Sequence, residues 1–320
     1  MCVSHNPNIF IGKYGFPVPA IGVAPPSAAR RSGLPAAPLR GDDVWVDLPK
    51  LFTGGDIDLE VEVMGDGEPV VIVQTALTAD ELRPLAERMA LSGGYQVIHD
   101  HRRGYAGSGP LLHSASVAAE AADCRALMAA LNVVPAHVVG VSYSAAIALT
   151  LASSAPETVR TLTVMEPPPV RVPSASQFLA ANARLLETFR AYGPTVALDE
   201  FLTLLVGPDW RRESERDLPG SVEAMERDAV TFFESDVPAM LSWDFGAEEA
   251  AAIRCPVLYV GGSDSGPWFA EVRARILQLL PHAEDTTVQG AGHLLASTHP
   301  SDAATLLMDF LRRHSPAGPA

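Results

Sequence analysis

The sequence has few cysteines and no long apolar run. Its three cysteines, Cys2, Cys124 and Cys255, are far apart and odd in number, which excludes a disulfide framework and a Cys-x-x-Cys pair for metal or redox chemistry. We therefore expect reduced thiols and a cytoplasmic protein. No apolar stretch approaches the ~20 residues that a membrane-spanning helix needs, and we expect no signal peptide at the N-terminus.

Positive charge is also scarce. The 320 residues include 23 Lys and Arg against 38 Asp and Glu, which gives a formal net charge of −15. An acidic surface of this kind argues against nucleic acid or an anionic membrane as the main partner. We expect a small molecule instead, and the composition leaves the oligomeric state open. With 48% hydrophobic residues, the chain can bury one large core.

Apolar strands and amphipathic helices alternate along most of the chain. Residues 1–41 are rich in Pro, Ala, Gly and Ser, and we predict that they form a poorly ordered extension. The alternation that follows is typical of βαβ units in a mostly parallel sheet. It stops at Pro167–Pro169, and only helices are predicted until it resumes near residue 256. The predicted organisation is an α/β core of residues 42–169 and 253–315 with a helical cap inserted at 170–252.

One stretch has the features of a nucleophile elbow. The apolar run His137–Val141 ends at Ser142, and helical residues follow. Gly140 lies two residues before the serine and Ser144 two residues after it. Small residues are required at both positions, because the backbone and the next helix crowd them. The turn would expose the serine hydroxyl beside the free N–H groups of the helix, whereas a simple N-cap serine is the alternative interpretation.

A serine nucleophile needs a base, an acid that orients the base, and donors for the oxyanion. Asp264 follows a late apolar strand, and His293 lies in a glycine loop after the last strand. Both come after Ser142 in the chain, as an elbow of this kind requires, and the carboxyl ends of parallel strands meet at one edge of the sheet. We predict that Ser142, His293 and Asp264 form a catalytic triad. Glu166, which directly follows another strand, is a competing acid that we rank second.

The chain resembles the α/β-hydrolase family over roughly residues 56–315. The stretches that carry the resemblance are RRGYAGSGP at 102–110, HVVGVSYSAAIALTLASSAPETVRTLTVMEPPP at 137–169, PVLYVGGSDS at 256–265 and GAGHLLASTHP at 290–300. The resemblance implies a doubly wound, mostly parallel eight-stranded sheet with a helical cap inserted after the sixth strand. It also implies a serine hydrolase that needs no cofactor.

The same resemblance implies an oxyanion hole made by the backbone N–H groups of Ala76 and Tyr143. The sequence departs from the family in this loop, where Gln74–Ala76 stands in place of the usual His-Gly. It departs again at His101, which replaces the usual Asp, and at Ser144, which replaces the usual glycine after the nucleophile. These changes are small enough to keep the fold, but they affect the surroundings of the predicted site.

No metal site is predicted. His99 and His101 have the spacing of a metal-binding pair, but no third ligand with suitable spacing accompanies them in the sequence. The sequence also has no H-E-x-x-H motif, no P-loop, and no dinucleotide-binding glycine motif after the first strand.

The leading hypothesis for function is a cofactor-independent serine hydrolase of carboxylic esters. The large apolar residues of the predicted cap favour a medium-sized, mostly uncharged acyl or aromatic substrate. The same triad could instead serve C–C bond or thioester hydrolysis, a lyase step or a cofactor-free peroxidase reaction. The non-enzymatic alternative is a small-molecule receptor on the same fold, which the altered loop at Gln74–Ala76 favours.

Overall fold

The computed structural model describes residues 9–10, 18–19, 50–54, 57–111 and 115–315. Of the predicted N-terminal extension, only β1 (Ile9–Phe10) and β2 (Val18–Pro19) lie within the described residues, and they pair antiparallel. The prediction of disorder for the rest of residues 1–41 falls outside the described residues. Among the described helices, none is both long and apolar enough to cross a membrane.

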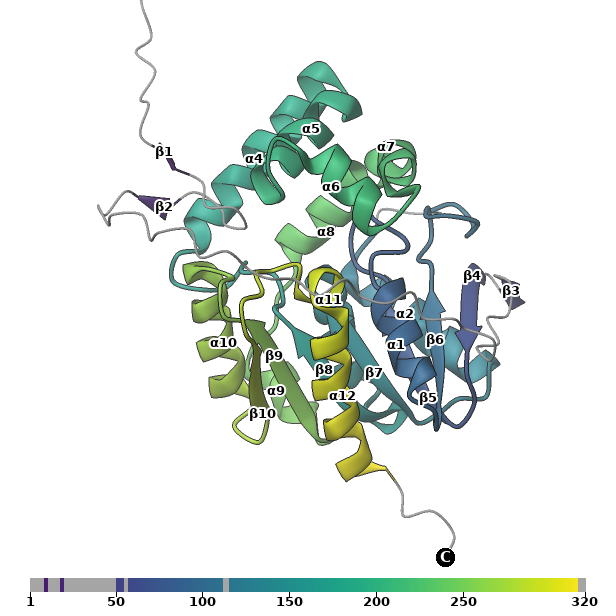
Figure 1. Cartoon of the computed structure of the whole chain (residues 1–320). Coiled ribbons are helices and arrows are strands. Elements are labelled where there is room, and N and C mark those ends of the chain that lie inside the picture. Colours follow the sequence, from purple (N-terminus) through teal and green to yellow (C-terminus); the bar gives the residue numbers. More distant parts are fainter. Residues whose placement is uncertain (1–8, 11–17, 20–49, 55–56, 112–114, 316–320) are drawn as a thin grey trace, which may run out of the picture.

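An eight-stranded sheet runs through the centre of the molecule in the order β10-β9-β8-β7-β5-β6-β4-β3 (Figure 1). Strands β5 to β10 are parallel, and β3 and β4 run antiparallel to their neighbours. This confirms the predicted doubly wound, mostly parallel sheet. The strands are β3 (Lys50–Gly54), β4 (Ile57–Met64), β5 (Glu68–Val73), β6 (Tyr95–Asp100), β7 (Ala136–Val141), β8 (Val159–Met165), β9 (Val257–Gly262) and β10 (Glu284–Val288).

Helices cover both faces of the sheet, which is why the central strands are apolar on both faces. In β5, for example, Val71 and Val73 pack into the cluster on one face, while Val70 and Ile72 pack into the cluster on the other. The first face carries α2 (Val117–Ala130), α3 (Tyr143–Ser154), α9 (Ala247–Ala252) and α10 (Pro267–Leu279), and the second carries α1 (Arg83–Leu91), α11 (Leu295–Thr298) and α12 (Pro300–His314). A short 3-10 turn, η1 (Pro156–Thr158), precedes β8.

The segment between β8 and β9 is helical throughout its described elements, and most of it lies beyond one end of the sheet (Figure 1). Its helices share a separate apolar cluster that includes Leu198, Trp210 and Phe233. Within the predicted cap range 170–252, α9 packs instead against α3 in the main layer, so the helices beyond the sheet end at Ser242. They are α4 (Ala175–Tyr192), α5 (Pro194–Leu205), α6 (Trp210–Asp217), α7 (Ser221–Thr231), the π-helical η2 (Phe232–Asp236) and α8 (Val237–Ser242).

A buried ionic cluster joins this helical segment to the sheet. Arg102, which follows β6 and is 4% exposed, donates through Nη2 to Asp236 Oδ2 at 2.6 Å and through Nη1 to Glu120. Its guanidinium also lies 4.9 Å and 4.8 Å from the ring centroids of Tyr105 and Tyr143. Because Asp236 ends η2 and Glu120 belongs to α2, one cation attaches the helices beyond the sheet to the core.

Removal of this cation should strongly destabilise the fold. We expect Arg102→Met to lower the free energy of unfolding by about 3–5 kcal/mol, because two carboxylates would remain buried without their cation. The control is Arg212→Met, which breaks the exposed pair with Asp209 and should cost less than about 1 kcal/mol. Urea denaturation followed by circular dichroism measures both variants, and equal losses would contradict this role of Arg102.

Candidate active site

Ser142 sits at the abrupt turn between β7 and α3. Its backbone has φ 51° and ψ −117°, a conformation that non-glycine residues adopt only under constraint. A side chain at Gly140 would come within 2.3 Å of the Ser144 carbonyl oxygen, so only glycine fits at that position. The Ser142 N–H donates to the Met165 carbonyl at 2.8 Å, which ties the turn to the end of β8.

Ser144, where the resembling family has glycine, adds a clamp to the turn. Its fully buried hydroxyl accepts a hydrogen bond from the Val141 N–H at 2.9 Å and lies 3.0 Å from the Val141 carbonyl oxygen, to which it can donate. The departure from glycine therefore leaves the turn intact and satisfies two backbone groups at the end of β7.

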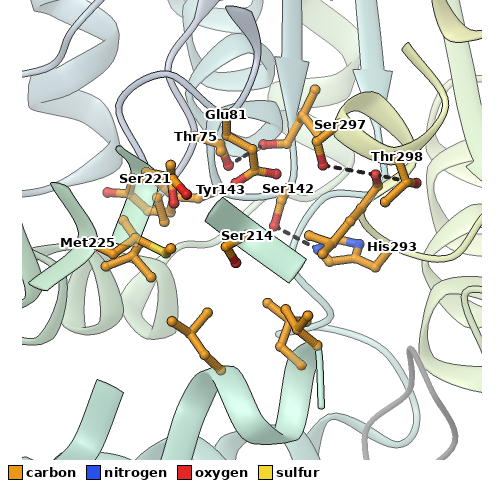
Figure 2. Close-up of a pocket in the computed structure, with 18 of the residues that line it drawn as sticks. Thr75, Glu81, Ser142, Tyr143, Ser214, Ser221, Met225, His293, Ser297 and Thr298 are labelled. Carbon is orange, nitrogen blue, oxygen red and sulfur yellow. Dashed lines mark hydrogen bonds between the residues drawn. The ribbon is translucent and has the colours of Figure 1, made fainter. Parts of the chain in front are cut away.

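A continuous chain of hydrogen bonds leads away from the Ser142 hydroxyl. Ser142 Oγ lies 2.9 Å from His293 Nε2, and His293 Nδ1 lies 2.9 Å from Glu166 Oε2 (Figure 2 shows the first contact). His293 comes from the glycine loop after β10, and Glu166 directly follows β8. The imidazole also stacks on Phe269, with ring centroids 4.0 Å apart and planes 12° from parallel, which fixes its orientation.

Asp264 is not hydrogen-bonded to His293, so the predicted position of Asp264 in the triad is wrong. The Asp264 side chain is exposed and accepts a hydrogen bond from the neighbouring Ser263 hydroxyl. The loop after β9 contributes a backbone group instead, because the Gly262 N–H donates to Glu166 Oε1 at 2.7 Å. Glu166, 1% exposed, therefore occupies the place next to His293 that was assigned to Asp264.

The predicted oxyanion donors lie on the two loops beside Ser142. Tyr143 is the first residue of α3, and Ala76 belongs to the loop after β5. In the described part of the chain, neither backbone N–H has a hydrogen-bond acceptor, so both are free to donate to a ligand. The altered loop is held by Gln74, whose Oε1 accepts a hydrogen bond from the Arg102 N–H at 2.6 Å.

A cavity of ≈ 910 Å³ opens over Ser142 and His293. Its floor comes from the loops after β5, β7 and β10, and its roof comes from the helices between β8 and β9 (Figure 2). The roof is largely apolar and includes Phe178, Leu202 and Met225. Asn182 and Ser221 interrupt it, and the charged residues Glu213, Arg216 and Asp217 of α6 also line the cavity. The cavity therefore suits a medium-sized ligand with an apolar body and some polar groups.

Among the carboxyl groups that line this cavity, Glu81 lies on the side of Ser142 (Figure 2). Burial raises the pKa of Glu81 from 4.5 to about 7, and the nearby His293 opposes part of that rise. Among the described residues, its carboxyl has no hydrogen-bond or ion-pair partner. Glu81 is thus available to a bound ligand. The sequence analysis missed it, because it lies in the turn before α1, outside the nucleophile elbow and the glycine loop of His293, and belongs to no motif.

Comparisons with known proteins establish the family. The family model described as alpha/beta hydrolase fold matches residues 69–300, well over half of the chain. The protein therefore belongs to the α/β-hydrolase fold family, which confirms the resemblance that the sequence motifs carry.

Individual relatives agree with this assignment. A protein of Azorhizobium caulinodans that bears the name carbamate hydrolase RutD is 27% identical over 271 residues, covering 80% of this chain and 96% of the relative. A carboxylesterase structure from Nitrososphaera gargenis has a TM-score of 0.68 at 20% identity, covering 81% of this chain and 95% of that one. An esterase from Thermogutta terrifontis has a TM-score of 0.65 at 20% identity, covering 84% and 99%. At these identities, the two structures show a shared fold.

The raised pKa of Glu81 has a consequence for stability. An unfolded chain releases this proton near pH 4.5, whereas the folded chain keeps it until about pH 7, so the contribution of Glu81 to stability falls as the pH rises between these values. We expect Glu81→Gln to remove that loss. The difference in melting temperature between the variant and the wild type should therefore increase from pH 4.5 to 7 and stay constant above pH 7. A difference that does not change with pH would contradict the raised pKa.

Proposed function

We propose that the protein is a serine hydrolase that cleaves acyl derivatives of medium-sized, largely apolar molecules, carboxylic esters first among them. The observation that carries the proposal is the hydrogen-bonded chain from Ser142 Oγ through His293 to Glu166. A serine hydroxyl is a weak nucleophile at neutral pH, and a neutral imidazole within hydrogen-bond distance is the group that can take its proton.

In the proposed reaction, Ser142 attacks the carbonyl carbon of the substrate while His293 Nε2 accepts the hydroxyl proton. His293 then gives this proton to the leaving alkoxide, and the acyl group stays on the serine. A water molecule, deprotonated by the same imidazole, releases the acid and restores Ser142. Glu166 holds the tautomer with the proton on Nδ1 and stabilises the imidazolium that forms in each half-reaction.

The backbone N–H groups of Ala76 and Tyr143 are proposed to stabilise the oxyanion of the tetrahedral intermediate. Support comes from their lack of other acceptors among the described residues. Tyr143 also begins α3, and the N-terminus of a helix favours negative charge. The substitution of the usual His-Gly by Gln74–Ala76 leaves both main-chain donors in place.

Carbamates are the second candidate substrates. The Azorhizobium caulinodans relative bears the name carbamate hydrolase, and a carbamate presents the same carbonyl to the serine, with nitrogen on one side. Glu81 supports this candidate, because a carboxyl group with a pKa near 7 beside the nucleophile can accept a hydrogen bond from a carbamate N–H or donate one to its oxygen.

A fluorophosphonate probe tests the proposed nucleophile. The purified protein should form a covalent adduct of the mass expected for one probe at Ser142, because the probe traps serines that a neighbouring base activates. Ser142→Ala should give no adduct, and its turnover of short p-nitrophenyl esters should fall by at least about 10⁴-fold. Ser153→Ala, near the other end of α3, is the control and should still be labelled.

An unlabelled wild-type protein would overturn the proposed serine nucleophile. Labelling without turnover of any ester, thioester or carbamate in a substrate panel would overturn the proposed hydrolysis, and it would favour the alternative of a small-molecule receptor. Faster turnover of carbamates than of esters with the same apolar group would make carbamates the preferred substrate class.

The identity of the acid can be tested separately. We expect Glu166→Gln to lower kcat by about 10³–10⁴-fold, because the amide no longer stabilises the imidazolium or enforces its tautomer. Asp264→Asn should leave kcat within a few-fold of the wild type, since that side chain is exposed and bonded to Ser263. The reverse result would restore the sequence-based assignment of Asp264.

A further inference from the structure

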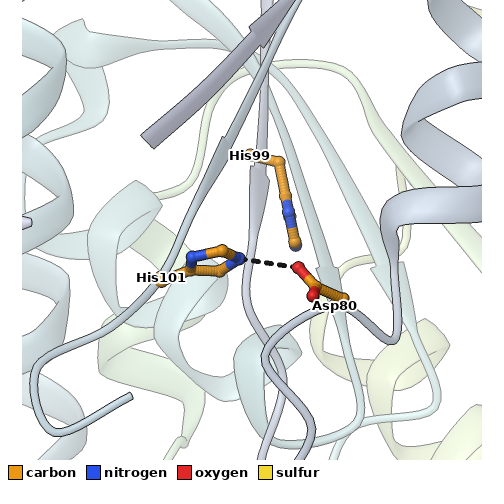
Figure 3. A group of neighbouring side chains, drawn as sticks. All are labelled: Asp80, His99 and His101. Carbon is orange, nitrogen blue, oxygen red and sulfur yellow. Dashed lines mark hydrogen bonds and ion pairs between the residues drawn. The ribbon is translucent and has the colours of Figure 1, made fainter. Parts of the chain in front are cut away.

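A second cluster of ionisable side chains lies on the face of the sheet that α1 covers. His99 on β6 pairs in register with Glu62 on the antiparallel β4, and side chains of paired residues point to the same face. His101 and Glu60 continue the two strands on that face, and their side chains are hydrogen-bonded to each other. Asp80, from the loop that leads into α1, closes the cluster (Figure 3).

His99 is the unexplained member of this cluster. Its side chain is completely buried, and neither ring nitrogen has a hydrogen-bond partner among the described residues. A buried polar group without a partner lowers the stability of the fold, and an imidazole with two such nitrogens is therefore an unusual choice for a core position. The ring points toward the pair formed by His101 and Asp80 (Figure 3), where a ligand could satisfy it.

The charge around His99 favours a cation. Three carboxylates, Glu60, Glu62 and Asp80, surround the two histidines, and one oxygen of Glu62 is also buried without a partner among the described residues. Arg83 contacts one of them, with Nη1 3.7 Å from Glu62 Oε1, and His101 lies between the other two, Glu60 and Asp80. Three carboxylates face two groups that can carry positive charge, so negative charge exceeds positive charge even when His101 is protonated.

We propose that His99, His101 and Asp80 bind a divalent transition-metal ion of the zinc type. One ligand atom from each residue lies within 4.8 Å of the others. Ligand atoms on one tetrahedral Zn²⁺ ion lie about 3.3–3.4 Å apart, given bonds of ~2.0–2.1 Å, so the side chains must close by up to about 1.4 Å to complete the site. Glu62, in register with His99, adds a negative charge beside the site but is not one of the three grouped ligands.

The surroundings of His101 fit this assignment. His101 Nε2 faces Asp80 at 2.9 Å and Nδ1 faces Glu60 at 3.0 Å. With Nε2 on the metal, Nδ1–H would donate to Glu60, and a carboxylate behind a metal-bound histidine is the common arrangement at zinc sites. Two imidazoles select zinc, copper, nickel or iron over Mg²⁺ and Ca²⁺, which prefer oxygen ligands.

The proposed ion is structural, and it does not depend on the proposed hydrolysis. It would fasten Asp80, and with it the loop that carries Ala76 and Glu81, to the end of β6. The sequence shows only the histidine pair, because Asp80 is brought next to it by the fold and not by local spacing.

Zinc binding by tag-free protein tests the site. After EDTA has been used to strip the protein and Zn²⁺ has been added back, the wild type should retain about one zinc ion per chain on gel filtration. It should melt at least about 5 °C higher with Zn²⁺ than without. Co²⁺ in place of zinc should give the visible absorption bands of a protein site with nitrogen ligands. His99→Leu and Asp80→Asn should lose the retained zinc and the rise in melting temperature.

His137→Leu is the matched control, because His137 is also a fully buried strand histidine but bonds Thr161 outside the cluster. It should keep the zinc-dependent rise, as should His282→Ala on the surface if His137→Leu does not fold. Metal-free His99→Leu should fold, since leucine replaces two unpaired buried nitrogens. A wild type that retains no zinc and shows no rise, or a rise that survives in both His99→Leu and Asp80→Asn, would overturn the proposal.

Discussion

The left-handed backbone of Ser142 is the constraint on which the site depends. Gly140 allows α3 to pass against β7, and the buried Ser144 hydroxyl closes the turn on Val141. The Ser142 N–H then bonds Met165 at the end of β8. Since Glu166 is the next residue, one backbone hydrogen bond sets the distance between the serine and the carboxylate that supports the histidine. The backbone of Glu166 also has a positive φ, 46°. The strained turns at the ends of β7 and β8 therefore direct the Ser142 and Glu166 side chains toward the same histidine.

This constraint explains why the sequence predicted that Ser142 and His293 meet but named the wrong carboxylate beside His293. An elbow is a local feature that the residues around Ser142 define. The glycine loop that carries His293 follows the last strand, so it lies at the same edge of the sheet as the elbow. The acid differs, because Glu166 and Asp264 both follow parallel strands and both carry a carboxylate. The decision rests on Gly262, whose N–H points at Glu166, and on a turn that sends the Asp264 side chain outward. Neither the direction of that N–H nor the path of that turn can be read from residue types.

The fold was predictable for a related reason. Strand and helix periodicity are local, and a parallel sheet with helices on both faces follows from their alternation. Contacts between distant segments were not predictable. The sequence gives no sign that Arg102 meets Asp236, 134 residues away, or that Asp80 completes a group with His99 and His101. The first contact joins a loop to a helix of another layer, and the second joins a loop to the end of β6. No periodic pattern constrains the partner in either case.

The contacts of Arg102 also hold the loop after β5, in which Gln74–Ala76 replaces the usual His-Gly. Arg102 donates through Nε to the Gln74 carbonyl and through Nη2 to the Thr75 carbonyl, at 3.1 Å each, while its backbone N–H bonds the Gln74 side chain. The guanidinium that holds Asp236 therefore also shapes the loop with Ala76. At the far end of that loop, Asp80 bonds His101, the residue just before Arg102. Two consecutive residues after β6 thus fix both ends of the loop, and one of them fixes the roof of the cavity, so the position of the loop and the position of the roof are set together.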